Sequence, residues 1–208
     1  MLSFSRASSG RPLFAHANRQ TSSLGPSLRL ALQWWKEVLD LSIAQVRPWR
    51  DERKDRVVVL ADARGWPARV AAVVLVDGQI HWTTMAISDE ILQYFKPRGD
   101  NQIGSLEILA IALAVSTFPG APRRRASALA SAGTASSVIA DLLRDRQVDL
   151  YSDNSGAEAA AKKGTAKEFD HASLVHGIWK RAAELNISLW VERVPTDDNW
   201  SDLPSRQE

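Results

Sequence analysis

The chain has 208 residues, of which 45% are hydrophobic and 24% are charged, and its formal net charge is +2. This length and composition suit one globular domain with a substantial core. The absence of cysteine excludes disulfides, thiolate metal sites and cysteine nucleophiles. The mildly basic charge permits nucleic-acid binding without establishing it. No membrane association is predicted, because no apolar run approaches the roughly 18 residues of a membrane span.

The N-terminal 25 residues are rich in Arg and Ser, and no acidic residue precedes Glu37. This composition predicts a disordered segment. It is typical either of a linker that follows an upstream domain, which we favour, or of an organelle transit peptide. The compartment therefore stays unknown: an intracellular location, cytoplasm or nucleus, is favoured, and an organelle is the alternative.

An amphipathic helix is predicted to begin at Pro26 and to run to about Val46. Apolar residues recur along it at spacings of three and four, and these are Leu28, Leu32, Trp35 and Leu39. The helix and the charged connector behind it make up an extension at 26–54, and the remaining domain is expected at 55–206.

Three consecutive strands are predicted next. The Val-rich run Val57–Ala61 is typical of a strand buried on both faces, and it leads into Asp62. Residues 71–76 and 79–85 flank an Asp-Gly pair, which supplies the positive φ angles of a tight hairpin turn. A polar loop is expected over 86–102.

Glu107 is the only charged residue between Ile103 and Phe118. A helix that is apolar nearly all round is a buried helix. A carboxylate in it must lose its charge or meet a compensating cation, and no Lys or Arg lies one helical turn away. We therefore expect the partner of Glu107 to come from elsewhere in the fold or to be a metal ion.

The second half of the chain continues with alternating elements. We predict an insertion over 119–147 whose last residues form a short helix up to Arg146, a strand at 148–152 that leads into Asp153, helices at 157–163 and 172–185, the second capped by Asp170, and a strand at 187–194. The whole order predicts an α/β protein. Its mixed sheet has about five strands, the first three antiparallel, and helices flank it.

Asp62 and Asp153 each follow a predicted strand, and α/β sheets place their sites at the carboxyl ends of strands. Together with the buried Glu107 and an acidic C-terminal segment, they make a constellation of carboxylates. Gathered like charges need a cation, and oxygen ligands without Cys or His favour Mg²⁺ or Mn²⁺. Zinc is disfavoured, because the four His are scattered.

Four runs of the sequence together resemble, in order and spacing, the ribonuclease H domain of retroelement (retrotransposon) reverse transcriptases. The runs are VVVLADARGW, IGSLEILAIALA, LYSDNSGAEAAAKKG and VERVPTDDNWSDLPSR. The resemblance implies a ribonuclease H-like fold and a metal-dependent endonuclease that cuts the RNA strand of RNA–DNA hybrids with two Mg²⁺ or Mn²⁺ ions. An upstream reverse transcriptase domain is the implied partner. The implied catalytic residues and metal ligands are Asp62, Glu107, Asp153 and Asp202, the last chosen because it keeps the Asn-x-x-Asp spacing.

Substrate contacts are expected beside the carboxylates, where groups could sense a 2′-hydroxyl or line the phosphate path. The candidates are Ala63, Arg64, Gly65, Asn154, Ser155, Lys162, Lys163, Lys167 and Asn199. Two alternatives stay open at this point: a catalytically inactive nucleic-acid-binding remnant of the same fold, and another two-metal nuclease of the 3′-5′ exonuclease or transposase type.

Overall fold

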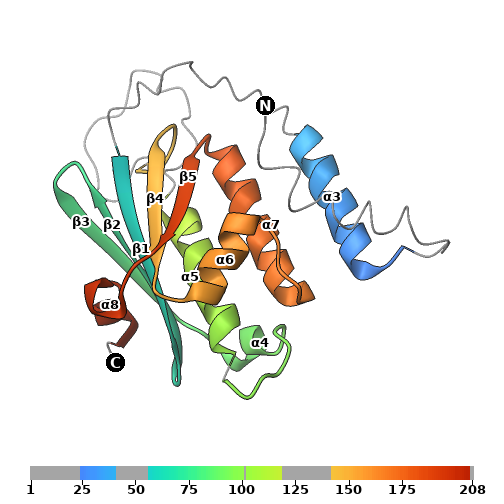
Figure 1. Ribbon diagram of the computed structural model, residues 1–208, viewed down its shortest axis with the longest axis horizontal. Helices are drawn as coiled ribbons and strands as arrows, with labels where there is room; N and C mark the ends of the chain where they lie inside the picture. The colour runs from blue at the N-terminus through green and yellow to red at the C-terminus, as the bar shows by residue number, and fades with distance from the viewer. Residues whose placement is uncertain (1–23, 41–55, 101, 119–141, 207–208) are drawn as a thin grey trace, which may run out of the picture.

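The computed structural model describes residues 24–40, 56–100, 102–118 and 142–206 (Figure 1). The predicted N-terminal disorder, the connector and most of the predicted insertion lie outside these residues. The elements are α3 (Pro26–Asp40), β1 (Arg56–Gly65), β2 (Ala68–Val76), β3 (Gln79–Ala86), α4 (Asp89–Leu92), α5 (Ile103–Thr117), β4 (Gln147–Ser152), α6 (Ser155–Lys163), α7 (Phe169–Glu184), β5 (Ser188–Arg193), the 3-10 turn η1 (Thr196–Asp198) and α8 (Asp202–Arg206).

The five strands form one mixed sheet in the order β3-β2-β1-β4-β5. Strand β2 pairs antiparallel with both β1 and β3, whereas β4 pairs parallel with β1 and β5 pairs parallel with β4. The hairpin turn has positive φ at both Asp77 (50°) and Gly78 (74°), as the Asp-Gly pair predicts. The predicted mixed sheet with three antiparallel strands at the start is confirmed.

Helix α5 packs against β1 and β2, and α7 packs against α5 (Figure 1). The burial follows from the sequence: α5 is apolar on all sides, and Leu106, Ile111 and Ala114 are fully buried. Helix α6 covers β4 and β5, and the short C-terminal α8 contacts β1, β2 and β3. The N-terminal helix α3 is an addition that packs on α7.

Asp62 was predicted to follow the first strand directly. It lies inside β1 instead. The parallel pairing of β1 with β4 stops at Ala61 and Ser152, whereas its antiparallel pairing with β2 continues to Gly65. The strand therefore runs past the apolar segment. One edge of β1 loses its neighbouring strand at the position of Asp62.

The apolar stripe predicted for α3 is wrong at two positions. Leu32 and Leu39 are exposed by 43% and 70%, whereas Trp34 is 7% exposed. The Trp34 ring lies against His176 of α7, and its centroid is 6.2 Å from that of the imidazole. The face of α3 that is buried is thus set by its contact with α7.

Three smaller predictions also need correction. The predicted polar loop contains the short helix α4, and residues 142–146 form turns instead of the end of a helix. Asp170 is not the cap of α7, because Glu168 occupies the N-cap and Asp170 lies in the first turn. There Asp170 accepts two hydrogen bonds of 2.9 Å from the guanidinium of Arg98.

Candidate metal centre

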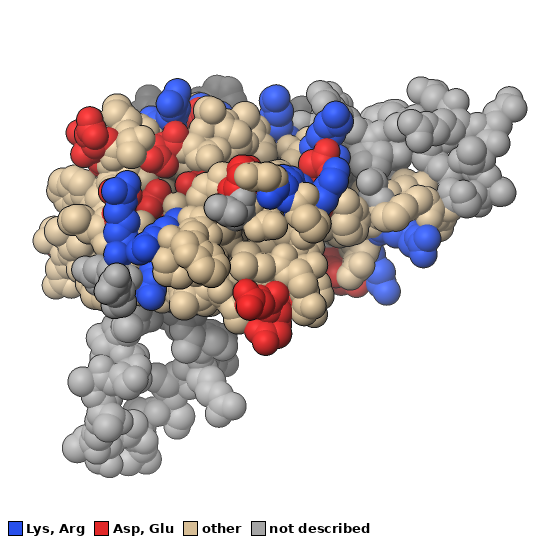
Figure 2. All heavy atoms as spheres, turned by 90° about the horizontal axis from the view of Figure 1, so that it is seen from below, with Lys and Arg blue, Asp and Glu red and all other residues tan. Residues whose placement is uncertain are grey.

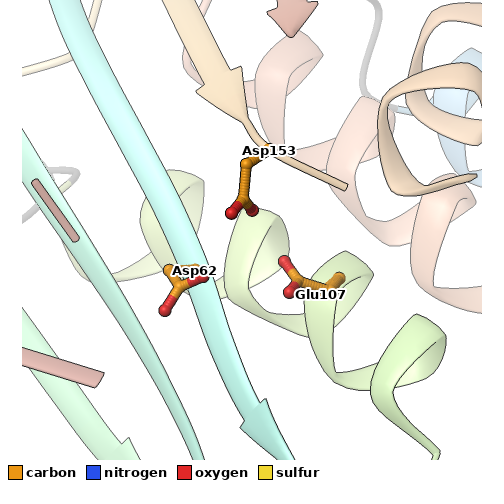
Figure 3. Close-up of side chains that lie close together, drawn as sticks. All are labelled: Asp62, Glu107 and Asp153. Atoms are coloured by element: carbon orange, nitrogen blue, oxygen red, sulfur yellow. The ribbon is translucent and has the colours of Figure 1, made fainter. Parts of the chain in front are cut away.

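Three carboxylates from different elements meet at the edge of β1 that β4 leaves uncovered. Asp62 lies in β1, Asp153 directly follows β4, and Glu107 reaches them from α5 (Figure 3). One oxygen from each of them lies within 4.8 Å of the others. The parallel register pairs Ala61 with Ser152, so the next residue of each strand, Asp62 or Asp153, arrives at the same level of the sheet.

Glu107 is positioned by the packing of its helix. Because α5 is buried against β1 and β2, the Glu107 side chain is 5% exposed. Its Oε2 atom is buried and has no hydrogen-bond partner in the described part of the chain. A buried polar atom without a partner is costly, so this oxygen needs a ligand of its own.

The electrostatics of the cluster oppose its ionisation. Burial, followed by the charges of Asp62 and Asp153, raises the pKa of Glu107 to about 9, although a backbone hydrogen bond from Ala63 acts in the opposite direction. Burial likewise raises the pKa of Asp62 to about 6, with the charges of Asp153 and Asp202 adding to it and a hydrogen bond from Ser205 opposing it. A bound cation would reverse both shifts.

The donor set fits a hard divalent cation. All three groups offer oxygen, which Mg²⁺ and Mn²⁺ prefer. Among the described residues, no Lys or Arg forms an ion pair with any of the three. The unpartnered Oε2 of Glu107 and the mutual repulsion of the carboxylates therefore both fit a metal ion between them.

Asp202, the fourth predicted ligand, lies outside the group of three. It is the first residue of α8, and its Oδ1 accepts a hydrogen bond of 2.6 Å from Nε of Arg206. Its charge nevertheless contributes to the raised pKa of Asp62. The structure thus places Asp202 near the cluster but pairs it with an arginine.

The two asparagines among the predicted substrate contacts bind neighbouring backbone groups. Asn154 caps α6, because its Oδ1 accepts from the backbone N–H of Gly156 (2.9 Å) and of Ala157 (3.0 Å). Asn199 is buried, and its Nδ2 donates to the backbone oxygen of Ala61 at 3.2 Å. Both asparagines therefore hold the backbone beside the carboxylates in place.

Of the other predicted contacts, Arg64 and Lys162 have partners within the protein, and the rest differ in exposure. Arg64 donates to the backbone oxygens of Trp66 (2.8 Å) and Arg206 (3.3 Å). Lys162 pairs with Glu158 at 2.7 Å and with Glu192 at 3.3 Å. Of the remaining candidates, Ala63 is buried, Gly65 is half-buried, and Ser155, Lys163 and Lys167 are exposed.

The face that is seen from below relative to Figure 1 carries charged side chains of both signs. Figure 2 shows Lys and Arg in several separate groups on this face, with Asp and Glu between them. Among the described residues, the basic side chains in this view form no single stripe.

Ser205 is a further residue at the site that was not predicted from the sequence. Its hydroxyl donates to Oδ2 of Asp62 at 2.5 Å, and its side chain is 1% exposed. The residue lies in the closing run of the resemblance, LPSR, which marks the segment as related to the site. Nothing in the sequence identifies its partner, however, because 143 positions separate Ser205 from Asp62.

No protein-family model matches the chain, and no curated protein matches it. Among solved structures, it is similar to the N-terminal RNase H domain of Rv2228c from Mycobacterium tuberculosis, solved as a fusion with maltose-binding protein. That comparison has 17% identity and a TM-score of 0.46, and it covers 72% of this chain and 90% of the other. The chain is also similar to RNase H1 from the halophilic archaeon Halobacterium salinarum NRC-1, with 18% identity and a TM-score of 0.47. That comparison covers 70% of this chain and 90% of the other. The likeness concerns the fold. No helix in the described ranges is long and apolar enough to cross a membrane.

Proposed function

We propose that the chain is a metal-dependent endonuclease that cuts the RNA strand of RNA–DNA hybrids. The observation that carries this proposal is the meeting of Asp62, Glu107 and Asp153 within 4.8 Å of one another. Each comes from the element for which the resemblance to retroelement ribonucleases H implies a metal ligand. The sheet that carries the site is mixed and five-stranded, and its first three strands are antiparallel, as predicted.

The three carboxylates are proposed to hold divalent ions, Mg²⁺ or Mn²⁺, between them. Two such ions would activate the attacking water and stabilise the leaving oxygen of the phosphodiester. The protein contributes a rigid set of ligands: Asp62 is fixed within a paired strand, and Glu107 is fixed in a buried helix. Asp202 is proposed as a fourth ligand, which requires its carboxylate to exchange Arg206 for an ion.

Hybrid binding is proposed to use groups around the cluster. Ser155 and Lys163 are exposed residues of α6, the helix that follows Asp153, and Arg64 lies two residues beyond Asp62. Contacts of this kind with phosphates and 2′-hydroxyls would position the RNA strand over the carboxylates. The origin in a retroelement reverse transcriptase, with an upstream polymerase domain as partner, is part of the same proposal.

The test is cleavage of a hybrid labelled on either strand, with matched single-stranded DNA and double-stranded RNA as comparison substrates. We expect internal cuts in the RNA strand that require Mg²⁺ or Mn²⁺ and that disappear with a chelator or in Asp153→Asn. Asp197→Asn is the matched control, because Asp197 is an exposed carboxylate in η1 and should leave the rate unchanged.

Other outcomes decide between the alternatives. Degradation of end-labelled single-stranded DNA would indicate a different two-metal nuclease. A folded chain that binds the hybrid with no cutting under either ion would indicate an inactive binding remnant. Either result would refute the ribonuclease proposal.

A further inference from the structure

The C-terminal segment is fastened to β1 around the first carboxylate. Three contacts connect them: Asn199 Nδ2 to the backbone oxygen of Ala61 (3.2 Å), Ser205 Oγ to Oδ2 of Asp62 (2.5 Å), and Arg64 Nη1 to the backbone oxygen of Arg206 (3.3 Å). The contacts thus fall on the metal-site residue itself and on positions before and after it. Only the contact from Ser205 reaches a carboxylate.

The Ser205 hydroxyl is enclosed. Its side chain and that of Pro204 are buried, and two oxygens lie within hydrogen-bond distance of Oγ: Oδ2 of Asp62 at 2.5 Å and the backbone oxygen of Asp202 at 3.0 Å. A hydroxyl has one hydrogen to donate. A carboxylate attracts that hydrogen more strongly than a neutral carbonyl, so the bond to Asp62 prevails when Asp62 is ionised.

The carboxylate of Asp62 needs such a restraint. An oxygen of Asp153 lies within 4.8 Å of one of its own, and like charges at this distance repel one another. Repulsion would rotate an unrestrained Asp62 carboxylate away from Asp153. A donor behind the carboxylate opposes that rotation, since it keeps one oxygen in place and leaves the other lone pairs for a cation.

We propose that Ser205 is a positioning residue that holds the Asp62 carboxylate ready for a divalent ion. The inference rests on the proposed metal site and deepens it. Outer hydrogen bonds to metal ligands typically change metal affinity about 10- to 100-fold. The C-terminal helix α8 therefore supports the site through Ser205, which binds the Asp62 carboxylate and not the ion or the substrate.

The experiment measures Mn²⁺ binding to the full chain by calorimetry, together with unfolding in chelator. Ser205→Ala should weaken Mn²⁺ binding about 10- to 100-fold. The control is Ser201→Ala, because Ser201 is a fully buried serine of the same segment whose hydroxyl bonds Oδ1 of Asn199 at 2.5 Å and no carboxylate. It should keep the affinity of the unmodified chain, even where it lowers stability by as much.

Ser205→Thr and Ser205→Val provide a second comparison at nearly equal volume. Thr retains the hydroxyl and should retain tight Mn²⁺ binding, whereas Val should bind as weakly as Ala. This pair decides the matter if Ser205→Ala fails to fold. Equal Mn²⁺ affinity in Thr and Val, or in Ala and the unmodified chain, would overturn the inference alone. Absence of Mn²⁺ binding in the unmodified chain would overturn the proposed function itself.

Discussion

Glu107→Gln should stabilise the metal-free protein at neutral pH while removing a metal ligand. The raised pKa of Glu107, about 9 against an ordinary 4.5, means that the folded chain holds a proton that the unfolded chain releases. Such a group contributes its full stability below pH 4.5 and loses it as the pH rises towards 9. Glutamine carries no charge in either state, so the variant lacks this loss.

The magnitude follows from the size of the pKa shift. A pH of 7.5 lies about three units above the ordinary pKa at which the carboxyl titrates in the unfolded chain, and each unit corresponds to ~1.4 kcal/mol of unfolding free energy. The variant is therefore expected to gain up to ~4 kcal/mol over the unmodified chain, as an upper value. For a domain of this size, that gain raises the melting temperature by on the order of 10 °C.

The assay is reversible unfolding in chelator near pH 5 and near pH 7.5. The gain from Glu107→Gln should be small at the lower pH and large at the higher one. Glu90→Gln, at an exposed position, is the control and should show no such growth with pH. With Mn²⁺ the order should reverse, because the unmodified chain binds the ion with three carboxylates and gains more binding energy than the variant. A variant less stable than the unmodified chain in chelator at pH 7.5 would refute the reasoning.

Three further predictions concern the stability of the fold. Asp170→Asn removes the charged partner of Arg98, whose side chain is only 19% exposed. The variant should lose about 3 kcal/mol of unfolding free energy, measured in urea. A loss below about 1 kcal/mol would contradict a tight ion pair. Asn154→Ala removes the cap of α6 and should cost about 1 kcal/mol, measured in the same way, and an unchanged midpoint would contradict that role. Burial lowers the pKa of His176, so the neutral imidazole contributes to the stability of the fold above pH 6.5, and this contribution is lost as the pH falls below that value. His176→Leu should therefore reduce the acid sensitivity of unfolding, and equal sensitivity would count against this account.

The strands and the buried helix were predictable because their signals are local. The Val-rich run, the Asp-Gly turn and the uncharged flanks of Glu107 each identify an element from its own residues. The same signals place Asp153 directly after a strand, which is where the structure has it. They also predict that Glu107 is buried, and its exposed fraction of 5% confirms this.

The remaining features depend on contacts between distant segments. The length of β1 is set by β2, which continues to pair after β4 has ended, so Asp62 lies inside the strand. The buried face of α3 is set by α7, which selects Trp34. The pairing of Asp202 with Arg206 and the contact of Ser205 with Asp62 likewise depend on how α8 folds against the sheet.

The most direct test of a metal site at the three carboxylates is anomalous diffraction from crystals grown or soaked with Mn²⁺. The account predicts anomalous density between Asp62, Glu107 and Asp153, and its loss in crystals of Asp153→Asn treated in the same way. Well-ordered carboxylates with no anomalous density between them, or Mn²⁺ bound only elsewhere on the chain, would contradict it.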